Sequence, residues 1–149
     1  MPRENSARLE LSYPHAMKKV LNIFLKALLT LILLMPILGA IGVFPAPTPE
    51  MYNTKEAYDF IAMIMAGKYI PILNAIVFGL SIVGLWANRV ALAAALMFPV
   101  TLNIVCFHLF LDGGLFTSGA IAGNLLLLLN LYFLWDSRKQ YCHLMKAPR

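Results

Sequence analysis

Several polar side chains occur inside segments that are otherwise apolar. The stretch NIVCFHLFLD, at positions 103–112, places Asn103 and His108 among aliphatic and aromatic residues. A polar group at membrane depth costs several kcal/mol unless it is paired or hydrated, so each must bond to a neighbour or serve a ligand. Other polar residues within the apolar segments include Asn74, Ser81, Thr101, Ser118, Asn124 and Asn130.

The chemistry available to these side chains is hydrogen bonding to a carbonyl group. Histidine and asparagine donate to carbonyl oxygens, and apolar walls around them suit an amphipathic ligand such as a quinone. The helical rise places His108 near the outer end of its segment, Asn103 roughly 7 Å deeper, and Asn74 roughly 6 Å below the outer start of another. His108, Asn103 and Asn74 therefore form a candidate ligand site, the alternative being that they only satisfy neighbouring backbones.

Other chemistries lack the residues they need. The predicted topology keeps Cys106 and Cys142 too far apart for a disulfide within one chain, and there is no CxxC motif. A bis-histidine haem site needs two intramembrane histidines, whereas only His108 is available. No phosphate-binding loop, dinucleotide fingerprint or Ser/His/Asp motif is present. The sequence thus predicts no catalytic set and no metal site, and an enzymatic role is open only as a subunit of a quinone-linked oxidoreductase.

Composition places these residues in a membrane protein. Of 149 residues, 60% are hydrophobic and 13% are charged, and mean hydropathy is +0.75. Charge-free runs reach the roughly 20 residues that a helix needs to cross about 30 Å of hydrocarbon. They predict an all-α integral membrane protein with four spans at about 20–44, 70–87, 90–111 and 113–135, which form a domain over 20–136 between a cytoplasmic N-terminal arm (1–19) and a cytoplasmic C-terminal tail (137–149).

The first apolar segment has a competing interpretation as a cleaved signal peptide. It follows basic residues and ends in small ones, but it is longer than a typical signal core. The following FPAPTP puts prolines where a small-residue cleavage motif would stand. A retained membrane anchor is therefore the favoured interpretation.

Basic residues are distributed by topology. With both termini inside, ten of the 12 Lys and Arg residues are cytoplasmic, and only Lys55 and Lys68 lie outside. This asymmetry predicts an N-in, C-in orientation. We expect the membrane to be a bacterial cytoplasmic (inner) membrane. The basic residues form no patch interleaved with aromatics, which argues against nucleic acid as a partner.

Short connections define the topology. The turns at WANRV and DGG are so short that the helices they join must be antiparallel neighbours, which predicts an up-down-up-down four-helix bundle. The longer first outer loop carries a helical pattern at about 54–66, with Asn53 as N-cap, Glu56 completing a capping box and Gly67 ending it. Too short to span, this helix is expected to lie in the interface, or alternatively to act as a lid.

A pair of glycines marks a close-packing face. Gly119 and Gly123 form a GxxxG motif, which lets another helix approach closely. The partner is either a helix of the same bundle or, in a homodimer, a second copy of the chain.

The stretch MFPVTLNIVCFHLFL, with Pro99, Asn103, Ile104, Phe107 and His108, resembles the third span of DoxX-like membrane proteins, and NLLLLLNLYFLW is similar in style to their fourth. The resemblance covers Val20 to Trp135. It implies a relative of the small subunit of a thiosulfate:quinone oxidoreductase, hence an accessory or quinone-linked component that needs a redox partner subunit in the lipid bilayer. The alternatives are a small-molecule or lipid-handling carrier and a non-enzymatic assembly protein.

Overall fold

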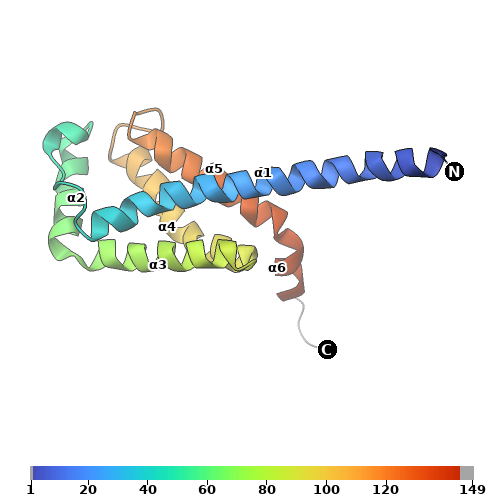
Figure 1. Ribbon diagram of the computed structural model, residues 1–149. Helices are drawn as coiled ribbons and strands as arrows, with labels where there is room; N and C mark the ends of the chain where they lie inside the picture. The colour runs from blue at the N-terminus through green and yellow to red at the C-terminus, as the bar shows by residue number, and fades with distance from the viewer. Residues whose placement is uncertain (1, 145–149) are drawn as a thin grey trace.

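The computed structural model describes residues 2–144, with side chains over 16–142, and this part of the chain is helical without strands (Figure 1). The predicted all-α class is thus confirmed. In chain order the elements are α1 (Pro2–Ala40), the short 3-10 helix η1 (Pro49–Met51), α2 (Lys55–Gly67), α3 (Tyr69–Trp86), α4 (Val90–Phe110), α5 (Ala120–Asp136) and α6 (Arg138–Leu144).

Three segments are long and apolar enough to cross a membrane: Ala16–Ala40 within α1, the whole of α3, and the whole of α4. The length and apolar composition of these helices confirm the prediction of a membrane protein. Helix α5 is also apolar but has only 17 residues. It begins at Ala120, not at about 113 as predicted, because residues 111–119 form a compact loop.

That loop turns sharply at two glycines. Gly113 and Gly114 have φ values of +82° and +109°, which side chains with a Cβ rarely adopt. The N–H of Gly114 donates to the carbonyl of His108 at 2.9 Å, which closes the end of α4. The reversal brings α5 back along α4.

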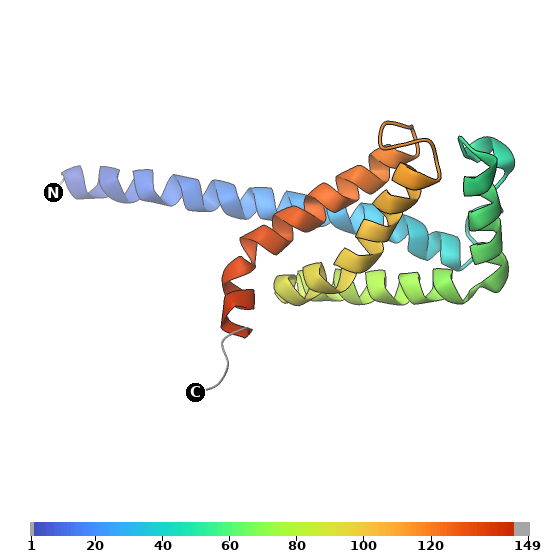
Figure 2. The same ribbon diagram turned by 180° about the vertical axis from the view of Figure 1, so that it is seen from behind.

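The helices pack in the order α1, α3, α4, α5, each mainly against the next, whereas α1 and α5 touch far less. Leu29 and Leu33 of α1, Phe78 of α3, Met97 of α4 and Phe133 of α5 are fully buried in a shared core. Figure 2 shows α1 projecting well beyond the other helices at its amino-terminal end. We call the sparse contact between α1 and α5 the seam.

Helix α2 runs across the end of α3 in both views, and Lys68 alone separates the two helices (Figures 1 and 2). Lys68 adopts a φ of +59°, so the left-handed residue is Lys68 and not Gly67. The N-cap also differs from the prediction. The side chain of Thr54, not that of Asn53, accepts from the N–H of Ala57 at 3.1 Å. Asn53 is instead engaged by the far end of α4.

Candidate functional site

A histidine–carboxylate pair joins the last turn of α4 to the loop that follows it. Nδ1 of His108 lies 2.9 Å from Oδ2 of Asp112, which follows one turn later, and the two side chains are only 13% and 3% exposed. An ionised carboxylate only accepts hydrogen bonds, so the contact holds the proton of His108 on Nδ1. Nε2 is then an acceptor in the neutral ring and a donor in the imidazolium.

Asp112 is held from the other side by the outer loop. The backbone N–H of Asn53 donates to its Oδ1 at 2.8 Å, and Nδ2 of Asn53 lies 3.2 Å from the same oxygen. Burial disfavours the charged carboxylate, but these bonds and the contact with His108 outweigh it and keep the pKa of Asp112 below its ordinary value. The site thus contains an ionised, almost fully buried carboxylate.

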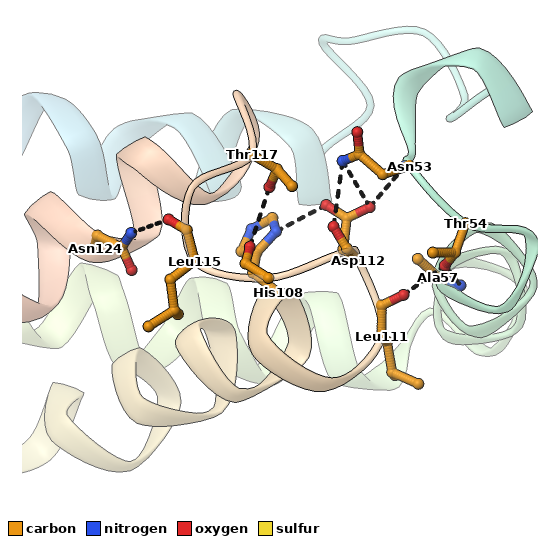
Figure 3. A network of polar contacts seen from close by, with 10 residues as sticks. Asn53, Thr54, Ala57, His108, Leu111, Asp112, Leu115, Thr117 and Asn124 are labelled. Atoms are coloured by element: carbon orange, nitrogen blue, oxygen red, sulfur yellow. Dashed lines mark hydrogen bonds and ion pairs between the residues drawn. The ribbon is translucent and has the colours of Figure 1, made fainter.

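Thr54 joins the start of α2 to the end of α4. Its hydroxyl donates to the carbonyl of Leu111 while accepting from Ala57 (Figure 3). We call Asn53, Thr54, His108, Leu111 and Asp112 the rim network. It fixes the outer loop on α4 through residues that are far apart in the sequence.

The loop beyond Asp112 is tied down by two further bonds, also drawn in Figure 3. Oγ1 of Thr117 donates to the carbonyl of Gly114 at 3.3 Å, and Nδ2 of Asn124 donates to that of Leu115 at 2.7 Å. Asn124, one of the intramembrane polar residues, therefore serves to anchor this loop to α5.

The two glycines of the GxxxG motif lie against His108. A Cβ placed on Gly119 would be 3.2 Å from Cε1 of His108, and one placed on Gly123 would be 3.5 Å from its Cδ2. The same Cβ on Gly123 would be 3.0 Å from Cγ2 of Ile104. Both glycines thus give α4 and its histidine room to approach α5 within one chain. A homodimer through Gly119 and Gly123 stays a prediction.

A cleft of about 430 Å³ lies on the seam beside His108. We call it the outer cleft, after the side of the membrane on which the sequence predicts it to lie. It is lined by Leu31, Ile32, Met35 and Pro36 of α1, by Ile104 and His108 of α4, by Gly119 directly before α5, and by Ala122, Gly123 and Leu126 of α5. Nε2 of His108 has no hydrogen-bond partner among the described residues, yet it keeps accessible surface. A polar atom is therefore available at an otherwise apolar cleft.

The other two predicted site residues lie elsewhere. Asn103 is exposed on α4 and Asn74 is half-buried on α3. Neither lines the outer cleft, and neither side chain has a hydrogen bond to the described part of the chain. The structure thus groups His108 with Asp112 and Asn53, which the candidate set lacked. The spacing of four between His108 and Asp112 was a usable signal, whereas nothing local marks Asn53.

The remaining intramembrane polar groups mostly bond to backbone. Ser81 donates to Val77 at 2.8 Å, and Thr101 donates to Met97 at 2.9 Å, each one turn back in its own helix. Nδ2 of Asn130 donates across to the carbonyl of Ala94 at 3.1 Å, while its buried Oδ1 has no partner within the described residues. These side chains are structural.

Among residues 16–142, whose side chains the structure describes, no group of three or more His, Cys, Asp or Glu side chains is placed to hold a metal ion. Comparison with protein-family models, with curated proteins and with solved structures gives no match.

Proposed function

We propose that this chain is a four-span inner-membrane protein of the DoxX-like type, whose outer cleft binds a quinone as part of a membrane redox system. Helix α5 is the fourth span, because its 17 residues extend about 26 Å, close to the hydrocarbon thickness of about 30 Å. Helix α2 then lies in the outer interface.

Charge placement supports the N-in, C-in orientation. Lys18 and Lys26 of α1 lie near Trp86 of α3 and Asp136 of α5, at the end of the bundle that also carries the α3–α4 turn. Lys55 and Lys68 flank α2 at the other end. Basic residues with interfacial tryptophan at one end fit the cytoplasmic side.

The observation that carries the ligand proposal is the available Nε2 of His108 at the apolar outer cleft, with Nδ1 held by Asp112. A quinone combines an apolar ring and tail with two polar oxygens, and such a ligand matches an apolar cleft with one polar group. The neutral ring accepts a proton at Nε2 from a hydroxyl, and the imidazolium donates to a carbonyl oxygen. Asp112 accepts the hydrogen bond from Nδ1–H of His108 in either case.

A bound quinone would supply the redox chemistry, and this chain supplies binding and a proton-holding group. The sequence has no thiol pair and only one intramembrane histidine, so electrons would have to be exchanged with a partner subunit. The role that fits is an accessory, quinone-linked component.

The test measures binding of a short-chain ubiquinone to the purified full-length protein by equilibrium dialysis. We expect His108→Ala to weaken binding about tenfold, the effect of losing one hydrogen bond in an apolar site. Asn103→Ala, on the same helix but outside the outer cleft, is the matched control and should leave affinity unchanged. Equal affinity of wild type and His108→Ala, or no binding by wild type, would refute the proposal.

A further inference from the structure

The opposite end of the seam contains a second, larger cavity of about 560 Å³. We call it the inner pocket. It lies between the amino-terminal half of the α1 span, the α3–α4 turn, and the junction of α5 with α6. Its lining comprises Lys18, Lys19, Asn22, Ile23 and Lys26 of α1, Trp86, Asn88 and Val90 around the turn, and Phe133, Asp136, Ser137 and Gln140.

The inner pocket has an excess of positive charge. Three lysines line it against one carboxylate, and Nζ of Lys18 already pairs with Oδ1 of Asp136 at 2.9 Å. Lys26 donates one hydrogen bond to the carbonyl of Leu85 at 2.7 Å, which leaves further N–H groups on its ammonium. Lys19 and Lys26 are therefore the cations available to an anion, and Asp136 disfavours one beside Lys18.

The rest of the lining divides into two kinds. Asn22, Asn88 and Gln140 carry amide groups that donate hydrogen bonds, whereas Ile23, Val90 and Phe133 provide apolar wall. Trp86 lines the pocket as well, and its indole N–H donates to Thr30 at 3.1 Å. Tryptophan favours the headgroup level of a bilayer. Cations, amide donors and apolar wall together match an amphipathic anion.

We infer that the inner pocket binds the phosphate group of an anionic phospholipid. Lys19 and Lys26 pair with the phosphate, the amides of Asn22 and Asn88 are within the same cavity to hydrogen-bond headgroup oxygens, and the acyl chains lie along the apolar wall toward the seam. Basic pockets between spans on the cytoplasmic side are recognised lipid sites. This inference rests on the lining of the inner pocket and on the proposed N-in, C-in orientation, and it is independent of quinone binding in the outer cleft.

The test uses the only tryptophan that lines the pocket as a reporter. The chain has two tryptophans, so Trp135→Phe leaves Trp86 alone. The full-length protein is reconstituted in phosphatidylcholine vesicles that contain increasing amounts of brominated phosphatidylglycerol, and quenching of Trp86 is followed. Matched vesicles with brominated phosphatidylcholine give the quenching expected from lipid that does not bind specifically.

We expect phosphatidylglycerol to quench Trp86 at mole fractions where brominated phosphatidylcholine does not, and Lys19→Gln to raise the half-quenching mole fraction about fivefold. Asp136→Asn should lower it. Lys139→Gln is the control, because Lys139 carries the same charge on exposed α6 surface outside the pocket. Its effect should be less than about twofold, since a charge outside the pocket acts only through the screened surface potential.

Identical quenching by the two brominated lipids would overturn the inference. So would an equal effect of Lys19→Gln and Lys139→Gln, which would indicate attraction to the membrane surface in general. Inorganic phosphate separates the two sources of the anion. A lipid site keeps its specific quenching in millimolar phosphate, whereas loss of that quenching would show that the free ion displaces the lipid and would overturn the assignment of phospholipid as the preferred occupant.

Discussion

Asn53 and Asp112 lie 59 positions apart in the sequence, yet the backbone N–H of Asn53 donates to Oδ1 of Asp112 at 2.8 Å. This bond joins the segment before α2 to the segment after α4. It also fixes the carboxylate that orients His108. The segment before α2 thus contributes a hydrogen-bond donor to the site.

Asp112→Asn should destabilise the protein by about 2 kcal/mol at neutral pH, because the backbone N–H of Asn53 and Nδ1–H of His108 lose a charged acceptor. The pKa of Asp112 is lower in the folded protein than in the unfolded chain. The ionised carboxylate therefore stabilises the fold above the unfolded pKa of about 4, and this contribution is lost as the pH falls through the pKa of Asp112 in the folded protein. The difference between wild type and variant should therefore shrink in acid. Thermal unfolding in detergent between neutral and acidic pH measures it.

The exposed carboxylate of Asp59 provides a control for this variant. Asp59 lies 3.8 Å from Lys55 on the surface of α2, and such exposed pairs contribute little. Asp59→Asn should leave the unfolding temperature and its pH dependence close to wild type. An Asp112→Asn variant as stable as Asp59→Asn would contradict the buried acceptor role.

Thr54→Ala should loosen the first turn of α2, because the N-cap acceptor for Ala57 and the bond to Leu111 are both lost. The expected cost is about 1 kcal/mol. Amide hydrogen exchange should accelerate in the first turn of α2 and remain unchanged in α5. Thr54→Ser keeps the hydroxyl and should restore protection; failure to do so would assign the effect to packing of the methyl group.

Gly123→Ala should push α5 away from α4, because the added Cβ would be 3.0 Å from Cγ2 of Ile104. We expect a loss of about 1 kcal/mol, at the low end for overpacking, because the contact is with a side-chain methyl. Gly79→Ala is the matched control, since nothing lies within 4 Å of a Cβ there. Unfolding of the two variants in a denaturing detergent compares them, and equal stability would mean that Ile104 moves without cost.

Asn130→Leu should be neutral or stabilising to within about 1 kcal/mol. It removes one hydrogen bond to Ala94 but also removes a buried oxygen without a partner in the described structure. Asn130→Asp, which places a charge at the same position, should be strongly destabilising. A large loss in the leucine variant would show that the unpaired oxygen has a partner in the membrane.

Cys142 provides a direct test of orientation. It is exposed on α6, which the N-in, C-in topology places in the cytoplasm. In a Cys106→Ala background, a membrane-impermeant maleimide should label it only after permeabilisation. Glu50→Cys, introduced into a chain without other cysteines, should react from outside intact cells. If Cys142 reacted from outside intact cells and Glu50→Cys did not, the outer cleft would lie on the cytoplasmic side and the inner pocket on the other.

The sequence was sufficient for the helical class and for the apolar segments, because charge-free runs of span length are a local property. It predicted the α3–α4 turn closely, since WANRV leaves only Ala87, Asn88 and Arg89 between the helices. It placed the start of the last long helix, α5, too early, because the apolar residues 115 and 116 belong to a loop that turns at Gly113 and Gly114.

The composition of the site was only partly predictable. His108 stood out as a lone histidine in an apolar run. Asn53 was assigned as a cap because its spacing to Glu56 suits one, but the side chain of Thr54 competes for that position and Asp112 offers Asn53 a charged acceptor. That acceptor comes from another helix end, and the contribution of α1 to the outer cleft depends on packing. Neither contact can be predicted from the local sequence.

The seam between α1 and α5 has a mechanical consequence. Both the outer cleft and the inner pocket have α1 as one wall and α5 as another, while α1 packs chiefly on α3. A small rotation of α1 about its contact with α3 would therefore change the two cavities together, without disturbing the α4–α5 pair. Binding in one cavity would then alter affinity in the other through the position of α1, with the same coupling free energy in both directions.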